Sequence, residues 1–170
     1  MGGIMKNRIL PKIFLLTLFV FGGMGCAASS HSTPPGQLKS FSFATGGSSR
    51  YEIRELSAIQ EGQGIRLQID TWLEINGEDQ QIQINKVVQE PDLLPKLAKL
   101  IREQKLSDWN GFDGKNSIGL DGNSFSFLAV YDRGGKIQAK GHIKLPKNYQ
   151  KGRTAILEIF EPYVKKYHGK

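Results

Sequence analysis

Alternating apolar and polar residues mark most of the chain beyond residue 38. The clearest run is IRLQIDTWLEI, residues 65–75, in which Ile65, Leu67 and Ile69 share one face and mostly polar residues take the other. A period of two is typical of a strand in an antiparallel sheet that is buried on one face. Similar runs predict further strands: two begin near residues 38 and 51, and the others cover residues 80–88, 125–131 and 137–145.

One segment between the strands changes to helical spacing. In PDLLPKLAKLIREQKL, Leu93, Leu97 and Leu100 recur at intervals of three or four residues, as they would on one face of a helix. Asp92 stands where a side chain can cap a helix start, and Pro95 suits a first turn. A helix is therefore predicted to follow the fourth strand.

A second helix is predicted near residues 152–167, where Ile156 and Phe160 lie on one face. Pro162 is expected to kink or interrupt it, because proline lacks the N–H that a helix interior needs. The predicted order of elements is ββββαββα. We therefore expect an α+β fold of two layers, in which an antiparallel sheet of about six strands carries both helices on one face.

Turn-forming residues separate the strands. Asn76 and Gly77 follow the third predicted strand, and both tolerate positive φ. Because Glu78 and Asp79 adjoin them, we expect a loop of more than two residues at this point. The run DRGG at residues 132–135 predicts another turn.

The start of the chain has the features of an export signal. Lys6, Arg8 and Lys12 make it positive, and Ile13–Phe21 is a run of nine residues that is apolar except for one threonine. Nine helical residues reach only about 14 Å, which is too short to cross a bilayer core of about 30 Å. Residues 1–25 therefore resemble a secretory signal peptide, which is removed from the mature protein.

Cys26 is the only cysteine of the chain, and it stands between the small residues Gly25 and Ala27. This arrangement resembles the lipobox of bacterial lipoproteins, although Gly23 occupies the position where that family usually has leucine. The resemblance implies that the signal is cut before Cys26 and that this cysteine carries the lipid that holds the protein to a membrane. The alternative is ordinary signal cleavage after Ala27 or Ala28, which would remove the cysteine.

The rest of the chain divides into a linker and one domain. Residues 26–37 comprise the cysteine and a small, polar run that contains two prolines, which predicts a flexible tether. Residues 38–170 have the size of a single domain. Ala27 follows the cysteine where an acid would favour retention at the inner membrane, so the lipoprotein resemblance implies the outer membrane if the cell has two.

Charge narrows the range of partners. Of the 23 Lys and Arg residues, three lie in the first 25 residues, so 20 remain against 16 acidic residues, a net of +4. Residues 133–170 hold ten of these basic residues and only two acids. This basic end either faces an anionic membrane or an acidic partner, or forms a solvated surface. Nucleic acid is not expected as a partner, because the chain is predicted to be exported and shows no nucleic-acid-binding motif.

Residues that usually carry catalysis are sparse. The sequence contains no H-E-x-x-H, no G-x-S-x-G and no phosphate-binding glycine loop. We therefore expect a protein that is not an enzyme and has no cofactor or metal; the EF-hand calcium template also fails at every aspartate of residues 107–127. The alternative is a hydrolase-like envelope enzyme in which His142 acts with Asp113 or Asp121.

The run SDWNGFDGKNSIGLDGNSFSF, residues 107–127, is the most unusual part of the sequence. Its two large aromatics, Trp109 and Phe112, either close the open end of the sheet or form a recognition patch for a ligand or protein. In the second case the protein could be a periplasmic inhibitor or assembly factor. The candidate binding loop comprises Trp109, Asn110, Phe112, Asp113, Asp121 and Tyr149.

The same region carries a family resemblance. The runs WNGF, LDGNSFSF, YDRGGKIQAKG and LPKNY, within residues 107–149, resemble a family of uncharacterised bacterial exported domains. The resemblance implies a compact envelope domain and no particular activity. The leading hypothesis is a lipid-anchored protein of the bacterial cell envelope with a non-catalytic binding or structural role and a possible envelope protein as partner.

Overall fold

The computed structural model describes residues 32–46, 53–75, 77–114 and 124–168. These residues form seven strands, two α-helices and one short 3-10 helix. In chain order the elements are β1 (Leu38–Gly46), β2 (Ile53–Glu61), β3 (Gly64–Ile75), β4 (Glu78–Val88), α1 (Leu93–Glu103), η1 (Leu106–Trp109), β5 (Asp113–Gly114), β6 (Ser124–Tyr131), β7 (Lys136–His142) and α2 (Tyr149–Tyr167).

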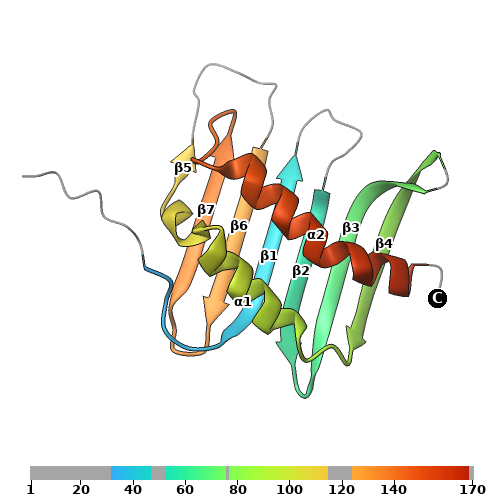
Figure 1. The fold of residues 1–170 in the computed structure, drawn as a ribbon, viewed down its shortest axis with the longest axis horizontal. Helices are drawn as coiled ribbons and strands as arrows, with labels where there is room; N and C mark the ends of the chain where they lie inside the picture. Colours follow the sequence, from blue (N-terminus) through green and yellow to red (C-terminus); the bar gives the residue numbers. More distant parts are fainter. Residues whose placement is uncertain (1–31, 47–52, 76, 115–123, 169–170) are drawn as a thin grey trace, which may run out of the picture.

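All the described strands belong to one sheet in the order β4-β3-β2-β1-β6-β7-β5. Neighbouring strands are antiparallel except for β5, which runs parallel to β7. Both helices lie across the same face of the sheet, and the other face is left open (Figure 1). The predicted α+β class is therefore confirmed. The sheet has one strand more than expected, because the two residues of β5 are too few to show a pattern in the sequence.

The core lies between the sheet and the two helices. Phe41 packs against Phe127 edge to face, with ring centroids 5.6 Å apart, and against Phe160 of α2 at 6.0 Å. From α1 the buried residues include Leu93 and Leu97, which the helical spacing had placed on one face. The alternation in β3 and β4 also holds, because the residues predicted to face inward are buried wherever the structure describes their side chains.

Helix α2 differs from the prediction at both its start and its interior. It begins at Tyr149, three residues before the predicted start, and it continues without interruption past Pro162. Proline deprives the carbonyl of Glu158 of its helical partner. Because Glu158 and Pro162 both lie on the exposed side of the helix, water can satisfy that carbonyl, and the expected break does not form.

Two other local predictions were wrong. The Asp92 side chain makes no capping hydrogen bond; its backbone carbonyl accepts one from the Lys96 N–H at 2.9 Å instead. Strand β7 ends at His142 rather than near residue 145, because Ile143 has a left-handed backbone with φ of 67° and leaves the ladder. The chain then turns towards the start of α2.

The hairpin between β3 and β4 is also tighter than predicted. Ile75 pairs directly with Glu78, so only two residues connect the strands. Gly77 has a φ of +83°, which glycine adopts at little cost. The acidic residues that follow are the first residues of β4, where their side chains reach solvent.

Residues 34–37, which the prediction counted with the tether, pack against the turn between β6 and β7. The Gln37 N–H donates to the Asp132 carboxylate at 3.0 Å, and the Asp132 N–H donates back to the Gln37 carbonyl at 2.9 Å. Gly36, with φ of +106°, and Gly135 allow this close approach, because an added Cβ would lie 2.1 Å from Asp132 and 2.5 Å from Pro34, respectively. The chain is therefore fastened to one end of the sheet before β1 begins.

Candidate functional site

The face of the sheet opposite the helices carries many polar side chains. Its side chains come from alternate positions of six strands, whose other positions form the core. Hydroxyl, amide and carboxylate groups predominate in its middle: Ser42, Glu55, Gln68, Asp70, Gln81, Gln83, Asn85, Ser126 and Gln138. Such a face offers many hydrogen-bond donors and acceptors to a partner and little apolar area.

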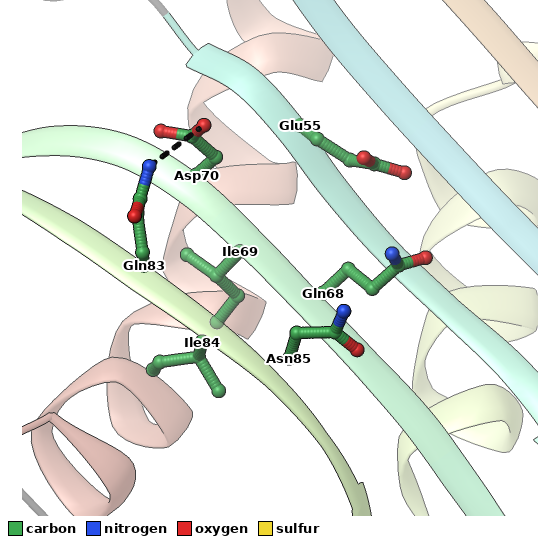
Figure 2. Close-up of a pocket in the computed structure, with 7 residues that line it drawn as sticks. All are labelled: Glu55, Gln68, Ile69, Asp70, Gln83, Ile84 and Asn85. Atoms are coloured by element: carbon green, nitrogen blue, oxygen red, sulfur yellow. Dashed lines mark hydrogen bonds between the residues drawn. The ribbon is translucent and has the colours of Figure 1, made fainter.

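A shallow depression of about 330 Å³ lies on this face over β2, β3 and β4 (Figure 2). Its polar lining comprises Glu55, Gln68, Asp70, Gln83 and Asn85. Each of the three strands contributes, and the antiparallel register places their side chains in adjacent rows across the sheet. The depression is thus made by strand pairing and not by a loop.

Hydrogen bonds hold part of this lining in place. The Asp70 carboxylate accepts from the Gln81 side-chain amide at 3.1 Å and, more weakly, from that of Gln83 at 3.5 Å. On the neighbouring strand the Ser57 hydroxyl donates to the Gln68 side-chain carbonyl at 3.1 Å. Asp70 is therefore oriented by neutral amide groups from β4.

An ion pair borders the depression on the side of the β2–β3 turn. The Arg66 guanidinium contacts the Glu61 carboxylate at 2.6 Å and also donates to the Asn85 side chain at 3.2 Å. This hydrogen-bonded pairing lowers the pKa of Glu61 and raises that of Arg66. Because both groups are exposed, the pair orients its neighbours more than it stabilises the fold.

Glu55 and Asp70 are direct cross-strand partners in the ladder between β2 and β3. Like charges opposite each other destabilise a sheet, and Figure 2 shows the two carboxylates pointing apart. Among the described residues neither forms a salt bridge with a cation. The depression therefore carries two carboxylates that form no salt bridge with any lysine or arginine of the described residues.

Sequence reasoning missed these residues. The alternation predicted only that polar positions such as Gln68 and Asp70 lie opposite the buried face of their strand. The like-charge pair of Glu55 and Asp70 appears only when the strand register is known, because the two residues are 15 positions apart in the sequence.

The predicted binding loop begins with a residue that belongs to the core. Trp109 is only 2% exposed, and its ring packs against Phe125 and Phe127, with centroids 5.9 and 5.5 Å away. Its indole N–H donates to the Lys147 carbonyl at 3.1 Å. Of the two alternatives for this aromatic, the structure therefore shows the one in which it closes the end of the sheet. Trp109 is not available to a partner.

Tyr149 is also a core residue, 7% exposed and 5.9 Å from the Trp109 ring, so its place in the binding loop was wrong. Phe112 is half-buried against Phe125. The Asn110 side chain accepts from the Gln138 N–H at 3.0 Å, which fixes the loop to the outer edge of β7.

Asp113 is exposed and lies 3.6 Å from the Lys140 ammonium. With Asn110 and Phe112 it borders a groove of about 280 Å³ along the outer edge of β7. Asp121 and Cys26 lie outside the described residues. The predicted site is thus divided between the core, this groove and a segment that the structure does not describe.

His142 occupies the last position of β7 and is partly buried beside its strand partner Ser124. Within the described ranges no three His, Cys, Asp or Glu side chains are grouped closely enough to bind a metal ion. A helix long and apolar enough to cross a bilayer is likewise not found among the described residues.

Comparisons with known proteins add no relative. No protein-family model matches the chain, and neither the curated proteins nor the solved structures contain a match.

Proposed function

We propose that this chain is a lipid-anchored protein of the bacterial cell envelope that acts by binding and not by catalysis. The anchor is a lipid on Cys26, and the binding surface is the open face of the sheet. The lipobox-like run and the resemblance of residues 107–149 to exported bacterial domains support the envelope location. In a cell with two membranes the anchor favours the outer one.

The like-charge pair in the depression is the observation that carries the binding role. Placing Glu55 opposite Asp70 does not favour the stability of the sheet, because like charges on paired strands repel each other. A cationic group bound beside these carboxylates would offset their negative charge and gain charge-assisted hydrogen bonds. The surrounding amides of Gln68, Gln83 and Asn85 can bond the polar groups beside that cation.

The partner that fits this chemistry is an envelope protein that presents an arginine or lysine side chain on a polar surface. The depression is open and shallow, and therefore suits the tip of a side chain better than an enclosed small molecule. Arginine is the better fit, since its planar guanidinium can bond a carboxylate and an amide carbonyl at once.

The anchor is tested by the intact mass of the protein purified from bacterial membranes, with Cys26→Ala as control. We expect a chain that begins at Cys26 and carries the added mass of the lipid, and we expect the control to lack that mass. A lipid-free chain that begins after Ala27 or Ala28 would contradict the anchor.

The binding surface is tested by following backbone amide NMR signals while acetyl-arginine-amide is added. We expect shifts that centre on residues 55, 68–70 and 83–85 and that disappear in the variant Glu55→Gln/Asp70→Asn. Acetyl-glutamate-amide, a probe of opposite charge, should not produce these shifts. Glu103→Gln removes one negative charge from α1, away from the open face, and should leave the arginine-dependent shifts unchanged. Arginine-dependent shifts that survive in the double variant would contradict the assignment of the site.

The enzyme alternative predicts a different pattern. If His142 acts with Asp113 or Asp121, then His142→Ala should abolish the biological effect of the protein while leaving its folding and its arginine binding intact. Loss of the effect in the Glu55→Gln/Asp70→Asn variant, with His142→Ala unaffected, favours binding over catalysis.

A further inference from the structure

The point at which the tether joins the domain limits how the domain can stand on a membrane. If Cys26 carries the lipid, only residues 27–33 remain between it and the segment fastened to the β6–β7 turn. Seven residues span at most about 25 Å when fully extended, whereas the twelve residues of β3 extend for about 40 Å. The end of the sheet that holds the tether therefore stays beside the bilayer.

The last row of side chains at this end of the open face crosses six strands in register. Its members, here called the tether-end row, are Lys136, Val130, Ser40, Ile59, Arg66 and Val87. The row lies next to the β6–β7 and β2–β3 turns, because its residues are among the first or last of their strands. It thus occupies the side of the domain that the tether holds nearest to the membrane.

The tether-end row is more apolar than the rest of the open face. Ile59 is 39% exposed and Val87 46%, and Val130, on another strand of the same row, is half-buried. The adjacent row adds Leu128, which is 37% exposed. Of the exposed large apolar residues in the described structure, only Ile143 lies away from this end. Exposed aliphatic side chains that gather at one place mark an interaction surface more often than scattered ones do.

Three basic side chains lie at or beside the β6–β7 turn. Lys136 and Arg133 are exposed, and Lys39 is half-exposed at the start of β1. Several carboxylates near the row are already engaged. That of Glu61 is paired with Arg66, and that of Asp132 accepts the N–H of the fastened tether. In the connection from β4 to α1, the carboxylate of Glu90 is paired with Lys166. Aliphatic side chains combined with lysine and arginine are the chemistry by which protein surfaces bind anionic bilayers.

We propose that the tether-end row, together with Lys39, is a contact surface for anionic phospholipid headgroups, so that the domain stands on the bilayer with its β6–β7 turn towards the membrane. This inference rests on the proposed lipid anchor. As a consequence, the depression at Glu55 and Asp70 keeps a fixed orientation relative to the membrane. The connection between β7 and α2, which contains Lys147, lies at the opposite end of the sheet and points away from the membrane.

The contact needs little affinity of its own. A short flexible tether gives an attached group an effective concentration in the millimolar range, so a contact that would be negligible in solution is populated beside the membrane. Each lysine or arginine near an anionic surface strengthens such a contact about fivefold. Ile59 and Val87 then add apolar area that can enter the headgroup layer.

The test uses the full lipidated chain in phosphatidylcholine vesicles with and without phosphatidylglycerol. Once Cys26 is lipidated, a cysteine introduced by Arg133→Cys or Lys147→Cys is the only free thiol and takes a single fluorophore. Lipids with a spin-labelled headgroup quench fluorophores that lie near the surface. We expect stronger quenching at position 133 than at position 147, and we expect the difference to grow when phosphatidylglycerol is present.

Two variants separate docking from mere tethering. In anionic vesicles, Lys136→Glu should lower the ratio of docked to undocked domains by about thirtyfold. The substitution removes one attraction to the anionic lipids and adds one repulsion of similar size, and each changes the ratio about fivefold. Lys147→Glu, which changes the net charge equally at the far end, should leave quenching at position 133 unchanged. Ile59→Ser/Val87→Ser should also weaken the docking, with Ile143→Ser as the matched control.

The outcomes keep the two proposals apart. A chain that lacks the lipid mass overturns the proposed anchor and this inference with it. A chain that is lipidated, but whose fluorophores at positions 133 and 147 are quenched equally, overturns the contact surface alone. The same holds if Lys136→Glu and Lys147→Glu have equal effects on quenching.

Discussion

The two faces of the sheet arise from the same alternating strands, yet they are stabilised in opposite ways. On the covered face, Phe41, Phe127 and Trp109 pack against the helices and one another, and almost nothing of them reaches water. On the open face, side chains such as Asp70 and Gln68 bond neighbouring strands and remain accessible. On the covered face, side chains must fit a close-packed core, whereas the open face can carry charged side chains in contact with water.

This difference separates stability from recognition within one sheet. Changes on the covered face should cost folding free energy, because they leave cavities or overlaps in a close-packed core. Changes on the open face should alter binding with little effect on stability, since solvent replaces what is removed. The four predictions below test this separation.

The largest effect is expected from the two tryptophans: Trp109 of η1 packs against the covered face, and Trp72 of β3 lies on the open face. Trp109→Ala should lower the free energy of unfolding by about 3–5 kcal/mol, as removal of a large buried aromatic does. Trp72→Ala, on the half-exposed side of β3, should lower it by about 1 kcal/mol or less. Urea denaturation followed by circular dichroism measures both. Equal losses of stability in the two variants would contradict the solvent exposure of Trp72 on the open face.

The contact between α2 and Trp109 gives the next largest effect. A Cβ on Gly152 would lie 2.7 Å from the Trp109 ring and 2.9 Å from Leu106. Gly152→Ala should therefore destabilise the protein by about 1–3 kcal/mol through overpacking, although alanine favours a helix by up to about 1 kcal/mol. Lys151→Ala, on the exposed side of the helix, is the control. A rise in melting temperature for Gly152→Ala would contradict the tight contact.

Low pH should weaken the contact between the end of α2 and Glu90, which precedes α1. The Glu90 carboxylate accepts hydrogen bonds from Lys166 and from the Tyr167 hydroxyl, and these bonds lower the pKa of Glu90. Since the folded state holds that pKa down, the stabilisation is complete above the unfolded pKa of about 4.3 and is lost as the pH falls through the lower folded value.

Melting temperatures of the protein and of Glu90→Gln should therefore differ most near neutral pH and converge in acid. Glu103→Gln, which affects an exposed pair with Lys99, should lower the melting temperature less at every pH. A difference between the protein and Glu90→Gln that does not shrink as the pH falls below the unfolded pKa of about 4.3 would mean that Glu90 acts through packing and not through its charge.

The smallest effect concerns the open face itself. Glu55→Gln removes the repulsion from Asp70 and should raise the free energy of unfolding by a few tenths to about 1 kcal/mol, the range of cross-strand pair energies. The gain should shrink at high salt, which already screens the two charges. A loss of stability in Glu55→Gln would show that the carboxylate is not under strain and would weaken the argument for a cationic partner.

Much of the fold could be predicted because local periodicity determines it. The alternation in β3 and β4 and the helical spacing of Leu93, Leu97 and Leu100 each reflect which side of an element faces the core. The boundaries at Ile143 and Tyr149 were missed because they depend on backbone geometry in a connection that carries no apolar period.

The candidate site was predicted far less well. Trp109 and Tyr149 come from distant segments, and whether they face solvent or each other depends on how α2 crosses the sheet. The pairing of Glu55 with Asp70 depends on the register of a hairpin that contains an irregularity between Ile53 and Glu55. A one-residue shift in that register would move one of the two carboxylates to the other face.

The sequence by itself determined the α+β class, the apolar side of each long element and the position of the one cysteine, because periodicity and composition act over a few neighbouring residues. Only the tertiary structure decided that Trp109 belongs to the core, that two carboxylates share a depression, and that residues 34–37 are fastened to the β6–β7 turn. These features join segments up to about 95 residues apart. Their contacts are set by strand register and helix packing, which no local pattern encodes.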